Sequence, residues 1–274
     1  MKKIIIILGI VIPLLVGCSS ENNTVKEEYI WGTENVNVDI VVEKGYRYGF
    51  NIPFAYVKEK DDIELVSIEG DNTDSLELEV SDDTIDDFDK AKVDNYRLGY
   101  LGVIYSLKED VDVTVESLNI NINGSYQQIK FEPPLIIRAH TNDTNICEYL
   151  ASGVLMHGKN NFLTYTLSWE ENVKILDCGL TGAFDTEEIT VFVDGKQVSA
   201  RETEVLANTK VQFDLTSRVE DKYEDSCLAG NFFVTYMYAS NEEKTYYISL
   251  NQQGAGDAKS AQIVLEQIIE RDKK

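Results

Sequence analysis

Large apolar side chains recur at every second position along much of the chain. From Tyr46 to Tyr56 each even-numbered residue is aliphatic or aromatic, whereas the odd positions include Arg47 and Asn51. A period of two places alternate side chains on opposite faces of a strand, so this segment is predicted to be half-buried. Pro53 then indicates a sheet edge or a bulge. The same alternation predicts further strands at residues 36–42, 76–80, 163–169, 211–215 and 246–250.

Two dipeptides predict tight hairpins between alternating runs. They are the Asn-Gly pair at 123–124 and the Asp-Gly pair at 194–195. Both pairs tolerate the positive φ angles of a type I′ turn, whose twist matches that of paired strands. Between residues 111 and 122 the apolar positions change from odd to even numbers. A bulge near Ser117 would absorb this change.

The two halves of the chain repeat a similar series of strands. Each half begins with an alternating aromatic strand, continues through a charged turn to a strand that ends near glycine, and later contains a strongly apolar strand. This pattern predicts an all-β fold of two β-sandwich (immunoglobulin-like) domains in tandem. One large sandwich with two similar sheets is the alternative. Adjacent prolines and a polar run between residues 133 and 145 place the boundary, so the domains span 31–139 and 140–254.

The last segment, residues 255–274, is predicted to be a single C-terminal α-helix. Asp257 can cap its first turn. We expect the helix to pack on the second domain or to cover a sheet edge, with binding to a partner as the alternative. Its apolar residues recur at helical spacing, namely at Ala261, Val264, Leu265, Ile268 and Ile269.

The N-terminal segment has the features of an export signal. Lys2 and Lys3 precede an apolar run over residues 4–16, which is shorter than the roughly 20 residues that a membrane-spanning helix needs. The sequence Leu15-Val16-Gly17-Cys18 at its end resembles a bacterial lipobox. An ordinary signal peptide followed by a chance cysteine is the alternative.

The lipobox resemblance implies that the chain is the precursor of a bacterial lipoprotein. It implies cleavage before Cys18 and acylation of the Cys18 thiol, which gives a signal peptide over 1–17 and a lipidated flexible tether over 18–30. Two acyl chains are enough for stable attachment to a bilayer. The expected location is the outer face of the bacterial cytoplasmic membrane or the cell surface, with the membrane as a partner through Cys18.

The charge of the chain limits its partners. Asp and Glu number 48 against 25 Lys and Arg, which gives a net charge of −23. Such a surface repels nucleic acid phosphates and anionic lipid headgroups, so we expect no nucleic acid partner. The acidity favours solubility. A cationic or metal-bridged partner is the alternative explanation.

Three cysteines remain besides Cys18, at positions 147, 178 and 227. Export places them where a disulfide can persist, and their odd number allows at most one intramolecular bond. Cys178 and Cys227 each fall at the end of a predicted strand and form the candidate pair. Alternatively, all three are buried thiols.

Acidic residues are concentrated between positions 61 and 94. Calcium requires several oxygen ligands that converge on one point. This region lacks the residue order of an EF-hand loop, and a solvated acidic loop is the alternative to a calcium site. No other cofactor is expected. The candidate ligands are Asp82, Asp83, Asp86, Asp87 and Asp89.

No catalytic residues are predicted. The chain has two histidines and none of the serine hydrolase, β-lactamase or zinc protease motifs. Four aromatic residues outside the clearest core faces are candidate ligand contacts: Trp31, Tyr96, Tyr100 and Tyr126.

The sequence therefore favours a surface-anchored, non-catalytic lipoprotein that acts as a binding or assembly module for a protein or glycan partner in the cell envelope. The alternative is an envelope glycoside hydrolase that uses two carboxylates, because 48 acidic residues allow such a pair.

Overall fold

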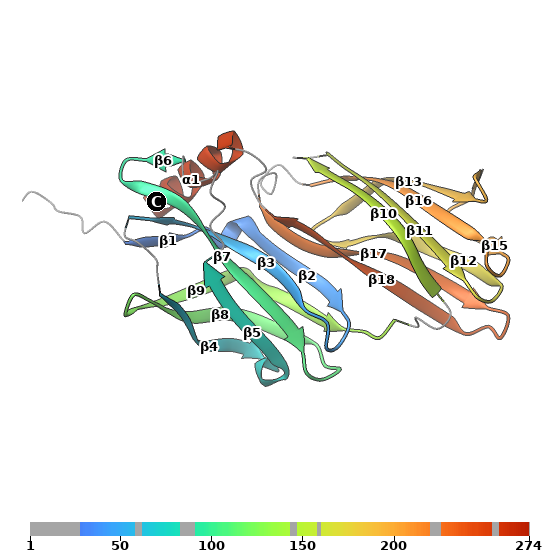
Figure 1. The fold of residues 1–274 in the computed structure, drawn as a ribbon, viewed down its shortest axis with the longest axis horizontal. Coiled ribbons are helices and arrows are strands. Elements are labelled where there is room, and N and C mark those ends of the chain that lie inside the picture. Colours follow the sequence, from blue (N-terminus) through green and yellow to red (C-terminus); the bar gives the residue numbers. More distant parts are fainter. Residues whose placement is uncertain are drawn as a thin grey trace, which may run out of the picture.

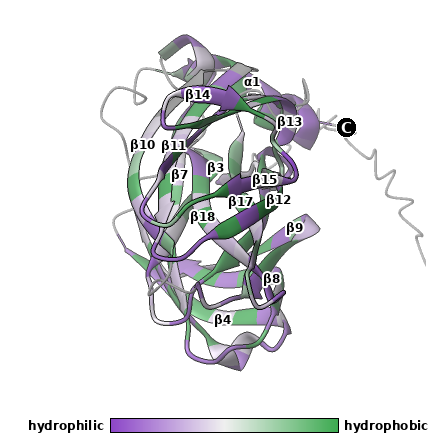
Figure 2. Ribbon diagram, turned by 90° about the vertical axis from the view of Figure 1, so that its right-hand side faces the viewer, coloured by the Kyte–Doolittle hydropathy of each residue, from purple (hydrophilic) through white to green (hydrophobic). Residues whose placement is uncertain are grey.

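The computed structural model describes residues 28–57, 62–82, 91–142, 147–157, 160–219, 226–253 and 258–273. Over these ranges the chain forms two β-sandwiches in tandem and one C-terminal helix (Figure 1). The predicted fold class is therefore confirmed. Hydrophobic and hydrophilic residues alternate along many of the strands (Figure 2).

The first sandwich consists of two sheets that enclose one apolar core. One sheet has the order β1-β3-β7-β5 with β6 beside β7, and its strands are β1 (Tyr29–Trp31), β3 (Tyr48–Tyr56), β5 (Leu76–Asp82), β6 (Lys92–Val93) and β7 (Tyr96–Leu107). The other has the order β2-β9-β8-β4, with β2 (Val36–Val42), β4 (Ile63–Asp71), β8 (Val113–Ile122) and β9 (Ser125–Ala139). Two short 3-10 helices lie at Thr33–Asn35 and Thr73–Ser75.

The second sandwich encloses a separate core, in which the rings of Tyr165 and Phe232 stack with centroids 4.4 Å apart. One sheet has the order β10-β11-β16-β13-β14, with β10 (Cys147–His157), β11 (Asn160–Trp169), β13 (Asp185–Val193), β14 (Lys196–Val198) and β16 (Lys210–Arg218). The opposite layer contains β12 (Val173–Gly182), β15 (Thr203–Val205), β17 (Cys227–Tyr238) and β18 (Glu243–Gln253).

The local features predicted from the sequence are present. In the pairing of β4 with β8, Glu69 lies opposite Ser117 and Gly70 opposite Val115, so Glu116 is the extra residue of the bulge predicted near Ser117. The Asn-Gly turn at 123–124 has φ angles of 50° and 82°, and the Asp-Gly turn at 194–195 has 48° and 74°. These values confirm both hairpin predictions.

The two sandwiches are joined by a shared strand. The start of β17, Cys227–Ala229, pairs in parallel with Val36–Val38 of β2, so one eight-stranded sheet runs through both layers. The Asn231 side chain extends this pairing, because its amide accepts a bond from the Val41 N–H at 2.6 Å and donates to the Val41 carbonyl at 2.7 Å. The Asn231 amide thus replaces a backbone peptide group in the ladder.

The connection between the domains makes a similar contact. The Asn142 side chain donates to the Tyr247 carbonyl and accepts from the Tyr247 N–H, both at 2.9 Å. The His140 ring nitrogen Nε2 lies 2.9 Å from the Thr245 carbonyl oxygen. Both sets of hydrogen bonds therefore hold the second sandwich against the end of the first.

The helix α1 (Ala258–Asp272) packs on the first sandwich. It contacts β1, β3, β6 and β7, and the five residues predicted as its apolar face belong to the first core. The expectation that it packs on the second domain is wrong, because the chain returns from β18 to the first sheet. Contact is close at Gly32, where a Cβ atom would lie 2.7 Å from Cδ1 of Ile268.

Strand β3 is more buried than its sequence predicts. Both faces are buried from Phe50 to Tyr56, because α1 and β17 also contact this strand. Pro53 lies just beyond the end of the β1 ladder, which stops at Phe54. The Pro53 carbonyl accepts a bond from the Gly32 N–H at 2.8 Å. The N–H and C=O groups of one strand residue point to the same side, so an N–H group on Pro53 would also face Gly32, beyond the last β1 pair. Its absence therefore interrupts no hydrogen bond of the ladder.

The described part of the chain begins within the predicted tether. Tyr29 and Ile30 are buried and pair with β3, so the ordered first sandwich includes residues assigned to the 18–30 tether. In the described ranges no helix has the length and apolarity needed to cross a membrane.

Candidate binding face on the second sandwich

The residues predicted for calcium and lipid lie mostly outside the described ranges. These are Cys18, Asp83, Asp86, Asp87 and Asp89. Asp82 is described and is the exposed last residue of β5. Within the described ranges no group of three or more His, Cys, Asp or Glu side chains is placed to hold a metal ion.

The predicted disulfide between Cys178 and Cys227 is wrong, because both cysteines are free. Cys178 pairs with Val234 across β12 and β17, whereas Cys227 begins β17. Cys227 and Val234 are therefore about 23 Å apart along the strand, and a disulfide requires Cα atoms within about 7 Å. Burial raises the pKa of both thiols to about 12. Each thiol is thus a protonated packing group rather than a nucleophile.

The four candidate aromatic residues do not form a common patch. Tyr96 and Tyr100 are core residues, with 4% and 1% of their surface exposed, so their prediction as exposed contacts is wrong. Trp31 is half-buried, and its ring lies 4.7 Å from that of Phe54. Tyr126 is exposed, but it lies in β9 of the other sheet.

Among the described residues, no other element covers one side of the sheet β10-β11-β16-β13-β14. In β11 the odd residues Leu163, Tyr165 and Leu167 point into the second core, so the even residues point outward. We call the outward side of β11, β16 and β13 the outer face. It consists of Phe162, Thr164 and Thr166 from β11, Gln212, Asp214 and Thr216 from β16, and Glu188, Thr190 and Phe192 from β13.

Strand register arranges these side chains in three rows across the sheet. The rows are Phe162–Thr216–Glu188, then Thr164–Asp214–Thr190, then Thr166–Gln212–Phe192. A phenylalanine therefore stands at opposite corners of the grid, and hydroxyl, amide and carboxylate groups lie between them.

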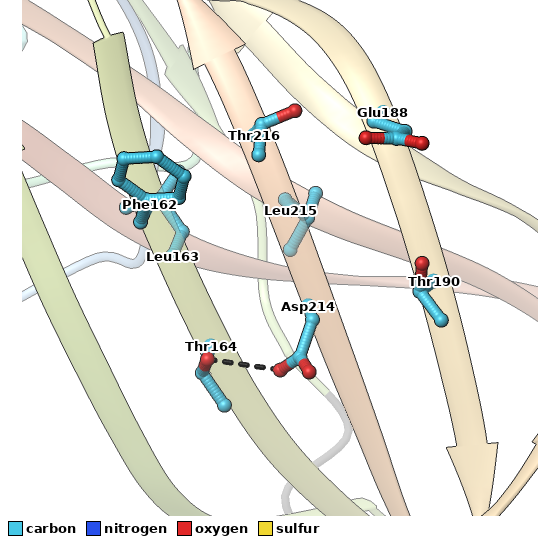
Figure 3. Close-up of a pocket in the computed structure, with 8 residues that line it drawn as sticks. All are labelled: Phe162, Leu163, Thr164, Glu188, Thr190, Asp214, Leu215 and Thr216. Carbon is cyan, nitrogen blue, oxygen red and sulfur yellow. Dashed lines mark hydrogen bonds between the residues drawn. The ribbon is translucent and has the colours of Figure 1, made fainter.

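Two shallow hollows occupy this surface. The first, of about 270 Å³, lies over the Phe162 and Asp214 rows and is drawn in Figure 3. The second, of about 620 Å³, lies over the Phe192 row and extends to Leu150 and Ala151 of β10. Together the hollows span the sheet from β10 to β13.

Asp214 is held at the centre of the outer face. Its carboxylate accepts a hydrogen bond from Thr164 Oγ1 at 2.9 Å (Figure 3) and two from Gln212 Nε2 at 2.9 and 3.1 Å. Glu188 lines the same hollow and makes no hydrogen bond or ion pair with the described residues. The hollow thus presents one fixed and one uncommitted carboxylate beside the Phe162 ring.

Phe162 is not among the contact residues predicted from the sequence. It is 55% exposed although it belongs to β11, a strand whose other face is core. Its even position in the sequence could have identified it. From residue 162 to 168 the other even positions are polar, namely Thr164, Thr166 and Ser168. An aromatic residue on the polar side of an alternating strand is an exception to the pattern.

No protein-family model and no curated protein matches the chain. It is similar to solved all-β structures that include a collagen adhesin (CNA) from S. aureus, at 7% identity and a TM-score of 0.24, covering 84% of this chain and 95% of that one. Another is the CFA/I adhesin CfaE of enterotoxigenic E. coli, at 10% identity and a TM-score of 0.26, covering 83% and 86%. A third is the Enterococcus faecalis MSCRAMM ACE, at 9% identity and a TM-score of 0.27, covering 80% and 93%. At these scores the similarity supports no inference about the site or its ligand.

Proposed function

We propose that the chain is a non-catalytic binding module of a bacterial cell surface, tethered by a lipid on Cys18, that binds a protein or glycan partner through the outer face. The observation that carries this proposal is the exposure of Phe162, 55%, at the first of two hollows on a sheet whose other side is a packed core.

An exposed aromatic ring among fixed polar groups is suited to binding rather than to stability. Covering the exposed half of a phenylalanine contributes roughly 1 kcal/mol. The Asp214 carboxylate, held by Thr164 and Gln212, supplies directional acceptors at the same place. Aromatic anchors surrounded by polar groups are typical of the centres of binding surfaces.

The proposed location depends on the N-terminal sequence. The short apolar run and Leu15-Val16-Gly17-Cys18 support export and lipid attachment. Mass spectrometry of the native product is expected to show a diacylated Cys18 at its N-terminus. An intact Met1 in the cytosolic fraction would contradict the anchor without bearing on the outer face.

Binding is tested with two exposed aromatic residues of similar exposure. Phe162→Ala removes the ring from the outer face, and Tyr126→Ala removes a 62% exposed ring from the first sandwich. Both proteins, with the unaltered chain, are incubated separately with purified cell-wall glycans and with extracted envelope proteins. We expect Phe162→Ala to weaken retention about fivefold or more, whereas Tyr126→Ala has no effect. Equal retention of all three proteins would contradict the proposed site.

The glycoside hydrolase alternative is tested at the same place. Glu188 and Asp214 are two carboxylates that line one hollow. If they cleave a glycan, the unaltered chain releases reducing ends from cell-wall polysaccharide, and both Glu188→Gln and Asp214→Asn abolish the release. If the outer face only binds, none of the three proteins releases reducing ends.

A further inference from the structure

The strand β10 forms an open end of its sheet. It has 11 residues and pairs with β11 alone in the strand order of the described residues (Figure 1). Beyond a bulge at Leu150, the segment from Ala151 to His157 keeps an unbroken register with β11. Its outer edge therefore presents a regular row of backbone N–H and C=O groups.

Apart from Glu148 at its start and the bulge at Leu150, β10 has no charge or proline that would keep another strand away. No residue from Tyr149 to Met156 is charged. Tyr149 and Leu150 are 42% and 37% exposed, so the start of this edge is also apolar. Natural proteins usually protect such an edge with charges, prolines, bulges or a covering segment.

The other long strands at the ends of sheets are protected by charges, bulges or a covering segment. Strand β4 contains three acidic residues and two register shifts. Strand β5 carries acidic side chains at Glu77, Glu79 and Asp82. The outer side of β18 is bonded by Asn142 and lies against His140. The terminal strands β1, β14 and β15 have only three residues each.

We propose that β10 is the interface between two copies of this chain, which pair antiparallel through this strand about a two-fold axis. Such pairing is self-complementary, because every contact occurs twice. Antiparallel pairing also places the two copies of Glu148 toward opposite ends of the strand pair. Self-pairing through β4 or β5 would instead bring carboxylates together, and like charges across a strand pair are unfavourable.

Charge also favours β10 over the other edges as the place where two copies of this chain meet. The chain has a net charge of −23, so two copies repel over most of their surface. The uncharged edge of β10 is where they can approach with little repulsion. Joining two such edges makes one ten-stranded sheet and brings two outer faces onto a single surface, which would increase the avidity of the proposed binding through two linked sites.

The test uses a charge exchange at Ser152, an exposed residue within the regular part of β10. Sedimentation velocity is measured on the chain from Ser19 to Lys274, which retains every described residue. We expect the unaltered chain to form a dimer. Ser152→Lys and Ser152→Glu are each expected to weaken the dimer about tenfold or more, because two like charges then meet near the axis. An equimolar mixture of the two variants restores the dimer.

The matched control is Gln197→Lys, which adds the same charge to the exposed strand β14 at the opposite end of the sheet. This variant should remain dimeric. Circular dichroism and melting temperature confirm that each variant is folded. A monomeric unaltered chain, or a dimer that Ser152→Lys and Gln197→Lys affect equally, would overturn the proposal. So would a mixture of the two Ser152 variants that stays monomeric.

Discussion

The two sandwiches differ in whether the outer side of a sheet is buried by other elements of the chain. In the first, β3 is buried on both faces because α1 and β17 contact it in addition to the opposite sheet. In the second, the sheet that contains β11, β13 and β16 has a core on one side only, and Phe162 remains 55% exposed on the other. Helix α1 packs on the first sandwich, whereas the outer face of the second sandwich stays exposed among the described residues.

Removing the helix is the largest test of this difference. A chain that ends at Gln253 lacks α1, whose Val264, Leu265, Ile268 and Ile269 are almost fully buried. Each such side chain contributes about 1.5–3 kcal/mol on burial, so we expect the first sandwich to lose more than about 5 kcal/mol and to unfold. The second sandwich should stay folded, because its core contains no helix residue.

The two tryptophans report on the sandwiches separately. Trp31 packs against the first core and Trp169 is buried in the second. In the truncated chain, Trp31→Phe leaves only Trp169, whose fluorescence should still show a cooperative unfolding transition in urea. The matching Trp169→Phe protein should show no transition from Trp31. If both tryptophans instead report one common transition, at the same urea concentration as in the chain that retains α1, then α1 does not stabilise the first sandwich selectively.

A milder change sharpens the same comparison. Leu265 is fully buried, whereas Ile263 on the same helix is 37% exposed. We expect Leu265→Ala to lower the free energy of unfolding by about 2–5 kcal/mol and Ile263→Ala to change it by less than about 1 kcal/mol. Urea denaturation followed at Trp31 measures both. Equal effects would mean that the packed face of α1 has been assigned wrongly.

Alkaline pH tests the strand that the two sandwiches share. Cys227 belongs to β17 but packs in the first core, where burial raises the pKa of its thiol to about 12. An unfolded thiol has a pKa of about 8.5, so between these values the unfolded chain loses a proton that the folded chain keeps. Stability therefore falls as the pH rises through this window, by about 2 kcal/mol at pH 10.

The Cys227→Ala variant isolates this effect. Other titrating groups are common to both proteins, so the difference in unfolding free energy between pH 7.5 and pH 10 should be smaller in the variant by about 2 kcal/mol. Identical pH dependence in the two proteins would show that the Cys227 thiol is accessible in the folded state.

Local patterns predicted the fold well, and distant contacts account for what was missed. Alternation and the turn dipeptides act within a few residues, which is why the strands, both hairpins and the bulge near Ser117 were predictable. Helical spacing showed which face of the last segment is apolar, but it cannot show which of two sandwiches lies against that face. The second buried face of β3 depends on α1, about 200 positions later in the chain.

The candidate site was less predictable for a related reason. Alternation along the sequence was the only guide to whether an aromatic residue is core or exposed. It misplaced Tyr96 and Tyr100 because both lie in β7, a strand with few exposed residues. Asp214 and Glu188 were two of 48 acidic residues until strand register placed them in one hollow. The disulfide prediction used strand ends without a distance between them.

The smallest expected effect on stability belongs to the outer face itself. Phe162 and Phe213 lie on neighbouring strands of one sheet, but Phe213 is fully buried and Phe162 is 55% exposed. Phe213→Ala should cost about 3–5 kcal/mol of unfolding free energy, whereas Phe162→Ala should cost less than about 1 kcal/mol. Urea denaturation followed at Trp169 measures both. A cost for Phe162→Ala close to that of Phe213→Ala would mean that the outer face is covered within the folded chain, and the contrast between a closed first sandwich and an open second one would then be lost.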